Sequence, residues 1–315
     1  MSIAFTFPGQ GSQTVGMGKE LADRFPEARA VFAEVDEALG QNLSAIMWEG
    51  SQDDLTLTAN AQPALMAVSL ATMRVAEARG LDLKASVAYV AGHSLGEYSA
   101  LAAAGTLSIG DAARLLRIRG TAMQQAVPVG EGAMAALLGL DFADAVAVAA
   151  EAAQGEVCQA ANDNAPGQVV VSGHKGAVER AIEIAKGRGA RRAILLPVSA
   201  PFHCALMAPA ADAMAEAFAS VRFNAPVVPL VANVLAAPIS DPDEIRARLV
   251  EQVTGTVRWR ETIAWMADAG VDTACEIGTG KVLTGMVKRI AKDMAGMAVN
   301  TAEDIDMLMD RLGSA

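Results

Sequence analysis

One serine in the sequence has the flanking residues that a nucleophile needs. Ser94 is the centre of the pentapeptide 92–96, Gly-His-Ser-Leu-Gly, which follows an apolar run at 87–90 and precedes a helical pattern. Small residues on both sides permit a sharp strand-to-helix turn that exposes the serine hydroxyl. The following helix would direct backbone N–H groups and its positive dipole end at a developing oxyanion. The bare pattern also occurs in structural turns, but its place between a strand and a helix favours a nucleophile.

A nucleophilic serine needs a base, and the sequence offers three histidines. His93 would have to fold back from the same turn, and His174 begins a helical pattern, which favours a surface or helix-terminal role. His203 lies in a charge-free segment bounded by prolines, where a core histidine is the default interpretation. Elimination nevertheless favours His203 as the base. Its neighbour Cys204 has poor geometry for a Cys/His pair and is expected to be a buried, inert thiol.

Arg119 is predicted to be buried. It lies on a helical pattern with a capping-box-like start at 108–111, and the residues three and four positions away on either side are all apolar: Leu115, Leu116, Ala122 and Met123. A buried guanidinium must be paired, and its planar fork suits a carboxylate bidentately. The alternative to a functional role is a structural salt bridge with one of the chain's own acids.

No nucleotide or metal site is predicted. The segment 277–282 resembles a phosphate-binding loop only superficially, because Cys275 stands where the first glycine belongs and Val282 follows the lysine. The sequence has no H-E-x-x-H pattern and no carboxylate cluster with the spacing of metal ligands. We therefore expect no metal.

The composition is that of a globular protein. Of 315 residues, 52% are hydrophobic and 19% are charged, which excludes intrinsic disorder and suits one large domain with an insertion or two domains. The net charge of −11 disfavours a general nucleic-acid or anionic-membrane surface. Long charge-free stretches are interrupted by proline and polar residues, which indicates buried interior rather than membrane spans.

The cysteines and the N-terminus indicate a reducing compartment. Cys158, Cys204 and Cys275 are odd in number, far apart and without a Cys-x-x-Cys pair. The first five residues lack the basic region of a signal peptide. A cytoplasmic location is expected.

Alternating strand and helix patterns predict a parallel α/β sheet, with strands at 3–7, 87–90, 227–232 and 273–277 and helices at 17–39 and 62–78. Between 130 and 199 the order changes to βαββαβ, which is typical of a ferredoxin-like unit. The predicted strands there are 133–140, 157–161, 168–172 and 193–198, and the helices are 143–153 and 176–186. We expect a large, hydrolase-like α/β domain of residues 1–129 and 200–315, with residues 130–199 inserted as a ferredoxin-like subdomain.

Motifs in order along nearly the whole chain resemble the malonyl-CoA:acyl carrier protein transacylase family of fatty-acid synthesis. The acyltransferase domains of polyketide and animal fatty acid synthases are similar more distantly. The motifs are Phe-Pro-Gly-Gln-Gly at 7–11, Gly-His-Ser-Leu-Gly-Glu at 92–97, Arg-Gly at 119–120, Pro-Phe-His at 201–203, Glu-Gln at 251–252 and Gly-Thr-Gly-Lys at 278–281. Thr279, where many members carry proline, and Cys204, where serine is frequent, depart from the family pattern at positions without a catalytic role.

The resemblance implies a role for each matching catalytic position. Ser94 would be acylated, His203 would be its base, and the backbone N–H groups of Gln10 and Leu95 would form the oxyanion hole. The backbone carbonyl of Gln252 would orient His203, in the place where a hydrolase uses an acid.

The resemblance also implies the substrates, malonyl-CoA and acyl carrier protein. Arg119 would bind the malonyl carboxylate, and Phe202 resembles the malonyl-selecting form of its segment. Coenzyme A and phosphopantetheine would enter as parts of the substrates, so no cofactor is expected.

The main competing function is that of a serine esterase or thioesterase of the α/β-hydrolase class, which predicts an H-G-G-G-type loop that the sequence lacks. The acyltransferase of a polyketide or malonate decarboxylase system would have a similar sequence. A non-catalytic scaffold of the same fold should have lost Ser94, His203 or Arg119, and all three are present.

Two basic regions depart from the general acidity, and carrier proteins of this pathway are usually acidic. The first lies where the second subdomain helix ends and comprises Lys186, Arg188, Arg191 and Arg192. The second is predicted on one face of the C-terminal helix, at i, i+7 and i+11 with a neighbour: Lys281, Lys288, Lys292 and Arg289. They are either ordinary solvated faces or a surface that steers the carrier toward Ser94.

Overall fold

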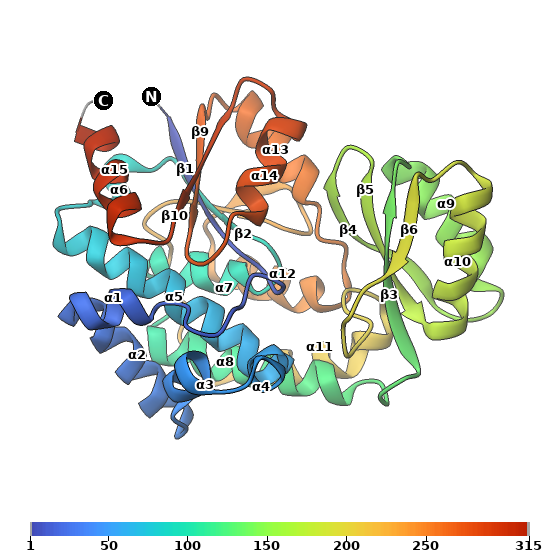
Figure 1. Cartoon of the computed structure of the whole chain (residues 1–315), viewed down its shortest axis with the longest axis horizontal. Helices are drawn as coiled ribbons and strands as arrows, with labels where there is room; N and C mark the ends of the chain where they lie inside the picture. Colours follow the sequence, from blue (N-terminus) through green and yellow to red (C-terminus); the bar gives the residue numbers. More distant parts are fainter. Residues whose placement is uncertain (1, 314–315) are drawn as a thin grey trace.

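The computed structural model describes residues 2–313, and a six-stranded sheet forms its centre (Figure 1). The order is β10-β9-β1-β2-β7-β8, with these bounds: β1 Ile3–Phe7, β2 Tyr89–Gly92, β7 Leu230–Ala232, β8 Ala237–Ile239, β9 Thr273–Ile277 and β10 Ala295–Val299. The first five strands in this order are parallel, and β8 pairs antiparallel with β7. Every residue of β1 and β9 is buried, as expected for parallel strands covered on both faces.

Helices cover both faces of this sheet. Ile3, Phe5 and Phe7 of β1 face the larger core, and Ala4 faces a smaller one. On the larger side, or near it, lie α1 Lys19–Arg24, α2 Pro26–Leu39, α3 Leu43–Glu49, α4 Gln52–Thr56, α5 Thr58–Ala78, α6 Leu83–Ser86, α7 Gly96–Ala103, α8 Ile109–Gln125, the short turn Ala205–Met207, α11 Ala208–Ala219, α12 Pro242–Thr254 and α15 Ala302–Gly313. The smaller core is covered by α13 Trp259–Asp268 and α14 Val282–Ile290.

A second, antiparallel sheet lies beside the first (Figure 1). Its order is β4-β5-β3-β6, with these bounds: β3 Gly132–Leu138, β4 Cys158–Ala165, β5 Gln168–His174 and β6 Arg192–Leu195. Two helices, α9 Phe142–Ala153 and α10 Lys175–Gly187, share a separate apolar core with it. The chain order βαββαβ is the predicted one, so the predicted α/β class with a ferredoxin-like part is confirmed. The boundaries at residues 130 and 199 stay our proposal.

Several elements differ from the sequence prediction. The helix predicted at 17–39 is divided into α1 and α2 by Pro26, because the residue before a proline avoids helical geometry and Phe25 is extended. Strands β8 and β10 were not predicted: β8 has three residues, and only Val299 of β10 is fully buried, so neither has a long apolar run. The last subdomain strand ends at Leu195 rather than at 198.

The outer edge of β4 is hydrogen-bonded to the segment that links α12 to α13. The backbone of Val257 donates to Ala161 O and accepts from Asp163 N–H, both at 2.9 Å. The buried carboxylate of Asp163 binds Arg260 through both of its oxygens. Within residues 2–313, no helix is both long and apolar enough to cross a membrane.

Candidate active site

Two loops meet at one edge of the central sheet. The loop containing Gln10 follows β1, and the pentapeptide around Ser94 follows β2; these strands are parallel neighbours. Their carboxyl ends therefore lie side by side. Strand β1 has β2 on one side and β9 on the other, so the later strands are added outward from β1 in both directions. Ligands of open α/β sheets bind in such a crevice.

The backbone of Ser94 is held in a left-handed conformation that residues other than glycine rarely adopt. Its φ is 55°, and it lies two positions before α7. The tight turn needs both glycines of the pentapeptide: a Cβ at Gly92 would lie 1.9 Å from Gly96 C, and a Cβ at Gly96 would lie 2.3 Å from Phe7 O. This is the strand-to-helix turn predicted from the sequence, and it presents the serine hydroxyl to the cavity.

His203 lies beside Ser94, although 109 positions separate them in the chain. Ser94 Oγ is 2.7 Å from His203 Nε2, and His203 Nδ1 donates to the backbone carbonyl of Gln252 at 2.9 Å. Burial and then the nearby Arg119 cation lower the pKa of His203 from 6.5 to about 3. The imidazole is therefore neutral at physiological pH, with Nε2 free to accept a proton from Ser94.

Arg119 is 1% exposed and points at the same hydroxyl. Its Nη1 donates to Gln62 Oε1 at 2.8 Å, and its Nη2 donates to Gln252 Oε1 at 2.8 Å and to Ser94 Oγ at 3.2 Å. These partners are neutral, and no salt bridge joins Arg119 to an acid among residues 2–313. The arrangement can bind a ligand carboxylate next to the Ser94 hydroxyl.

A buried acid for which the sequence predicted no role organises this site. Glu97 Oε1 accepts from the backbone N–H of Asn233 at 2.6 Å, and Glu97 Oε2 accepts from the Gln252 side chain. Asn233 Oδ1 in turn accepts from Ser94 N–H, and Gln252 Nε2 donates to Ser94 O, both at 2.8 Å. The Ser94 backbone is thus held from both sides by residues bound to Glu97. The sequence signal was an acid one turn after the serine on an apolar helix.

The N–H groups of Gln10 and Leu95 remain available at the cavity. Both residues line it, and neither N–H has an acceptor among the hydrogen bonds of residues 2–313. Leu95 directly precedes α7, so its N–H adds to the positive end of that helix. Two such donors near Ser94 are what an oxyanion requires.

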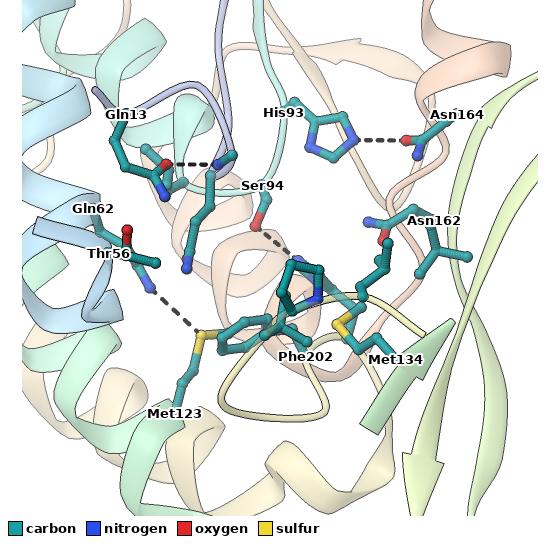
Figure 2. Close-up of a pocket in the computed structure, with 18 of the residues that line it drawn as sticks. Gln13, Thr56, Gln62, His93, Ser94, Met123, Met134, Asn162, Asn164 and Phe202 are labelled. Atoms are coloured by element: carbon teal, nitrogen blue, oxygen red, sulfur yellow. Dashed lines mark hydrogen bonds between the residues drawn. The ribbon is translucent and has the colours of Figure 1, made fainter. Parts of the chain in front are cut away.

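The cavity itself has a volume of about 500 Å³ and lies between the two sheets. Phe202 and Met123 line it on the large-sheet side, and Met134, Asn162 and Asn164 line it from the small sheet (Figure 2). Apolar side chains thus surround a few converging polar groups, as in most small-molecule sites.

The remaining histidines and Cys204 lie outside this hydrogen-bonded centre. His93 Nε2 donates to Asn164 Oδ1 at 2.8 Å, away from Ser94 (Figure 2), and His174 Nδ1 accepts from Val157 N–H at 2.9 Å. Cys204 is fully buried, and burial raises the pKa of its thiol. No group of His, Cys, Asp and Glu side chains within 2–313 has the arrangement of a metal site.

Arg191 of the first basic region and Arg289 of the second lie beside the turn between β4 and β5. The side chain of Arg191 lies over Gly139, Gly139 N–H donates to Gly167 O, and Arg289 binds Pro166 O and Gln168 Oε1. Lys186 pairs with Glu183 at 2.6 Å, and Arg188 pairs with Glu151, so these two cations are partly neutralised.

The expectation of a single helical face for the second basic region was wrong. Lys281 precedes α14, Lys292 lies beyond its end at Ile290, and α15 is the C-terminal helix. Lys288 and Arg289 are in the last turn of α14. Arg192, Lys281 and Lys292 are exposed.

Comparisons with known proteins agree with the fold and the motifs. The model of the acyl transferase domain family matches residues 4–304. The malonyl CoA-acyl carrier protein transacylase of Escherichia coli K12 is 49% identical over 298 residues, which cover 95% of this chain and 96% of that protein. A crystal structure of acyl-carrier-protein-S-malonyltransferase from Bartonella henselae is 60% identical with a TM-score of 0.98, covering 99% of this chain and 100% of that one.

A second similar structure is that of a malonyl-transacylase in complex with the acyl carrier protein of a type II polyketide synthase. It is 43% identical with a TM-score of 0.95, covering 99% of this chain and 100% of that one. The family resemblance read from the motifs is therefore confirmed. The chain belongs to the acyl transferase family and, within it, to the malonyl-CoA:acyl carrier protein transacylases.

Proposed function

We propose that this protein transfers the malonyl group of malonyl-CoA to the phosphopantetheine thiol of an acyl carrier protein, through a malonyl ester on Ser94, in fatty acid biosynthesis. The observation that carries the proposal is the buried Arg119, which has only neutral partners and donates to the Ser94 hydroxyl. A carboxylate on the acyl chain supplies the missing negative charge beside the nucleophile.

In the first half-reaction, His203 Nε2 takes the proton of Ser94 Oγ as the oxygen attacks the thioester carbonyl. The N–H groups of Gln10 and Leu95 stabilise the resulting oxyanion. When the intermediate collapses, the C–S bond breaks and the imidazolium gives its proton to the departing coenzyme A sulfur. The bound carboxylate offsets the charge of Arg119 and thereby raises the basicity of His203 as the reaction begins.

In the second half-reaction, the phosphopantetheine thiol attacks the malonyl ester while His203 removes the thiol proton. The C–O bond to Ser94 then breaks, and the proton returns from His203 to Ser94 Oγ. The carbonyl of Gln252 holds His203 in one tautomer throughout. Phe202 shapes the acyl side of the cavity for malonyl groups. All chemical steps use side chains and backbone of this chain, so the proposal includes no cofactor. We also propose a cytoplasmic location, where the three unpaired thiols stay reduced.

The first prediction concerns the covalent intermediate. Ser94→Ala should abolish the malonyl adduct and lower turnover by on the order of 10⁴-fold or more, because no other hydroxyl or thiol within residues 2–313 is hydrogen-bonded to the His203 ring. Intact-mass measurement after mixing with malonyl-CoA, and then with carrier protein, tests this directly. The unsubstituted protein should gain one malonyl group and pass it to the carrier; rapid loss of the group to water would instead indicate a hydrolase. An adduct on the alanine variant would refute the assignment.

The second prediction concerns the choice of acyl group. Arg119→Ala should sharply reduce kcat/KM for malonyl-CoA and spare that for acetyl-CoA, because only malonyl-CoA has a carboxylate for the guanidinium. Leaving a buried charge unpaired costs about 3–5 kcal/mol, which is the basis for discrimination against acetyl-CoA in the unsubstituted protein. Steady-state kinetics with both substrates measure the change. Equal losses, together with a large fall in Tm, would mean that Arg119 is purely structural.

The third prediction concerns pH. Because the pKa of His203 is lowered to about 3, the folded protein keeps this base neutral on acidification. The acylation rate, which reports the free protein at low substrate concentration, should stay flat between about pH 7 and pH 5 in single-turnover experiments. A decline with a midpoint near 6.5, the ordinary pKa of histidine, would contradict the proposal.

The same shift predicts that the contribution of His203 to folding stability falls on acidification. The unfolded chain takes up a proton at His203 near pH 6.5, whereas the folded chain does so only near pH 3, so this contribution is fully present above pH 6.5 and is lost as the pH falls to about 3. Burial raises the pKa of Glu97 from 4.5 to about 8, so the contribution of Glu97 changes in the opposite direction and rises as the pH falls from about 8 to about 4.5. Melting curves recorded at each pH define the range in which the kinetics refer to folded protein.

We propose the two basic regions as the docking surface for an acidic carrier protein. Their residues are Lys186, Arg188, Arg191, Arg192, Lys281, Lys288, Arg289 and Lys292. Two arguments support it: the chain is acidic overall, so an acidic partner needs local basic groups, and Arg191 and Arg289 lie beside the turn between β4 and β5, two strands that also line the cavity. Complementary charge raises the encounter rate and fixes orientation more than it adds affinity.

The fourth prediction tests this surface. Charge reversal at Arg191 and Lys288 should raise the apparent KM for carrier protein and flatten its salt dependence, while acylation by malonyl-CoA stays nearly unchanged. A control with the same charge change is reversal at Arg74 and Lys84, at the end of α5 and on α6, far from the small sheet (Figure 1). Unaltered carrier kinetics at low ionic strength in the Arg191 and Lys288 variant would rule out the surface.

A further inference from the structure

A chain of hydrogen bonds leads from Arg119 to Gln10. Arg119 Nη1 donates to Gln62 Oε1 at 2.8 Å, and Gln62 Nε2 donates to Thr58 Oγ1 at 3.0 Å. Thr58 Oγ1 then donates to Gln10 Oε1 at 2.9 Å. Arg119, Gln62 and Thr58 are each 1% exposed, so water does not compete for these bonds. The group that faces the acyl carboxylate is thus connected to the residue whose N–H faces the oxyanion.

Arg119 dictates the direction of every bond in this chain. A guanidinium can only donate, so Gln62 must turn its oxygen toward Arg119 and its NH₂ group toward Thr58. The Thr58 oxygen therefore accepts from Gln62, and its single proton is left for Gln10. That proton fixes the orientation of the Gln10 side chain at its oxygen. A residue without a hydroxyl at position 58 would interrupt this chain of hydrogen bonds between Gln62 and Gln10.

The backbone beneath this chain is closely packed. Gly120 follows Arg119 on α8, and a Cβ there would lie 2.6 Å from Thr58 O and 2.7 Å from Ala59 Cα. The absence of a side chain lets α8 touch the first turn of α5 directly. Thr58 is the first residue of α5, and its hydroxyl bonds Gln62 of the same helix and Gln10 outside it. Arg119 and Thr58 therefore keep a fixed spacing, and the hydroxyl is reserved for Gln62 and Gln10.

We propose that Thr58 is a positioning residue that couples carboxylate binding at Arg119 to the placement of the Gln10 N–H group. This inference rests on the proposed function, because it requires Arg119 to bind malonyl and Gln10 to face the oxyanion. In the free protein Arg119 also donates to Ser94 Oγ. A bound carboxylate takes over that donor, frees the nucleophile and holds the guanidinium in one orientation. Gln62, Thr58 and Gln10 are then ordered in turn, so a malonyl group improves its own oxyanion hole.

The consequence is that selectivity for malonyl appears in the rate of acylation as well as in binding. Thr58→Val keeps the side-chain shape and removes the hydroxyl. We expect the single-turnover acylation rate constant for malonyl-CoA to fall by about 10-fold to 100-fold, somewhat less than the loss of an oxyanion donor itself. The Kd for malonyl-CoA should change little, because Arg119 keeps its contact with Gln62. The rate constant for acetyl-CoA should fall less, because the acetyl group has no carboxylate to bind Arg119.

A double-mutant cycle separates coupling from mere support of the fold. In an Arg119→Ala background, Thr58→Val should have little further effect, because the chain of bonds has already lost its origin. Thr58→Ser keeps a hydroxyl and should restore most of the rate. The matched control is Thr72→Val: Thr72 is buried on the same helix, and its hydroxyl donates to Val68 O, one turn earlier in that helix. That variant should acylate normally, and Tm measured for all variants shows that they are folded.

The outcomes distinguish this inference from the proposed function. If the unsubstituted protein forms no malonyl adduct, the proposed function itself fails. If it forms the adduct and Thr58→Val acylates equally fast, Thr58 has no positioning role. Equal losses with malonyl-CoA and acetyl-CoA, or a full loss also in the Arg119→Ala background, would show that Thr58 supports the loop independently and would overturn the coupling.

Discussion

The arrangement of this site depends on one buried cation that has no ion pair of its own among the described residues. Arg119 is held by the amides of Gln62 and Gln252 and by the hydroxyl of Ser94. Burying a charge with only neutral partners is costly, and the cost is reduced when a ligand carboxylate arrives. Because a guanidinium only donates hydrogen bonds, it also fixes which way both amides point. Substrate recognition and the geometry of the free site are therefore set by the same group.

The buried acid Glu97 is connected to this cation only through an amide. Gln252 stands between Arg119 and Glu97, accepting from the first with its oxygen and donating to the second with its nitrogen. A direct ion pair would satisfy Arg119 and leave nothing for the malonyl carboxylate to gain. Because burial raises the pKa of Glu97 to about 8, this acid is mostly uncharged at pH 7 and does not neutralise Arg119. Glu97 instead fixes Asn233 and Gln252, which hold the Ser94 backbone at its strained φ of 55°.

Local patterns in the sequence predicted the elements, and motifs predicted the residues that meet. The strand-turn-helix around Ser94, the buried face of α8 and the βαββαβ order all follow from periodicity and glycine spacing, which are local properties. The contacts of Glu97, Gln62 and Thr58 could not be predicted, because each depends on a partner more than 45 positions away. Strand β10 was not predicted, and Lys292 was wrongly placed on a helical face, for a related reason. Packing, rather than composition, decides where a half-buried edge strand forms and where a helix ends.

The segment 252–260 shows why the inserted subdomain and the catalytic base are not independent. Gln252 orients His203 through its carbonyl, Val257 pairs with the edge of β4, and Arg260 binds the buried Asp163 of the same strand. A shift of the small sheet relative to the large one would therefore pull on the residue that aligns His203 with Ser94. Proton transfer between these two side chains tolerates little displacement, since a misplacement of about 1 Å is costly for catalysis. The position of the small sheet and the orientation of the base are thus linked. The ion pair between Asp163 and Arg260 therefore contributes to the alignment of His203, although it lies outside the cavity.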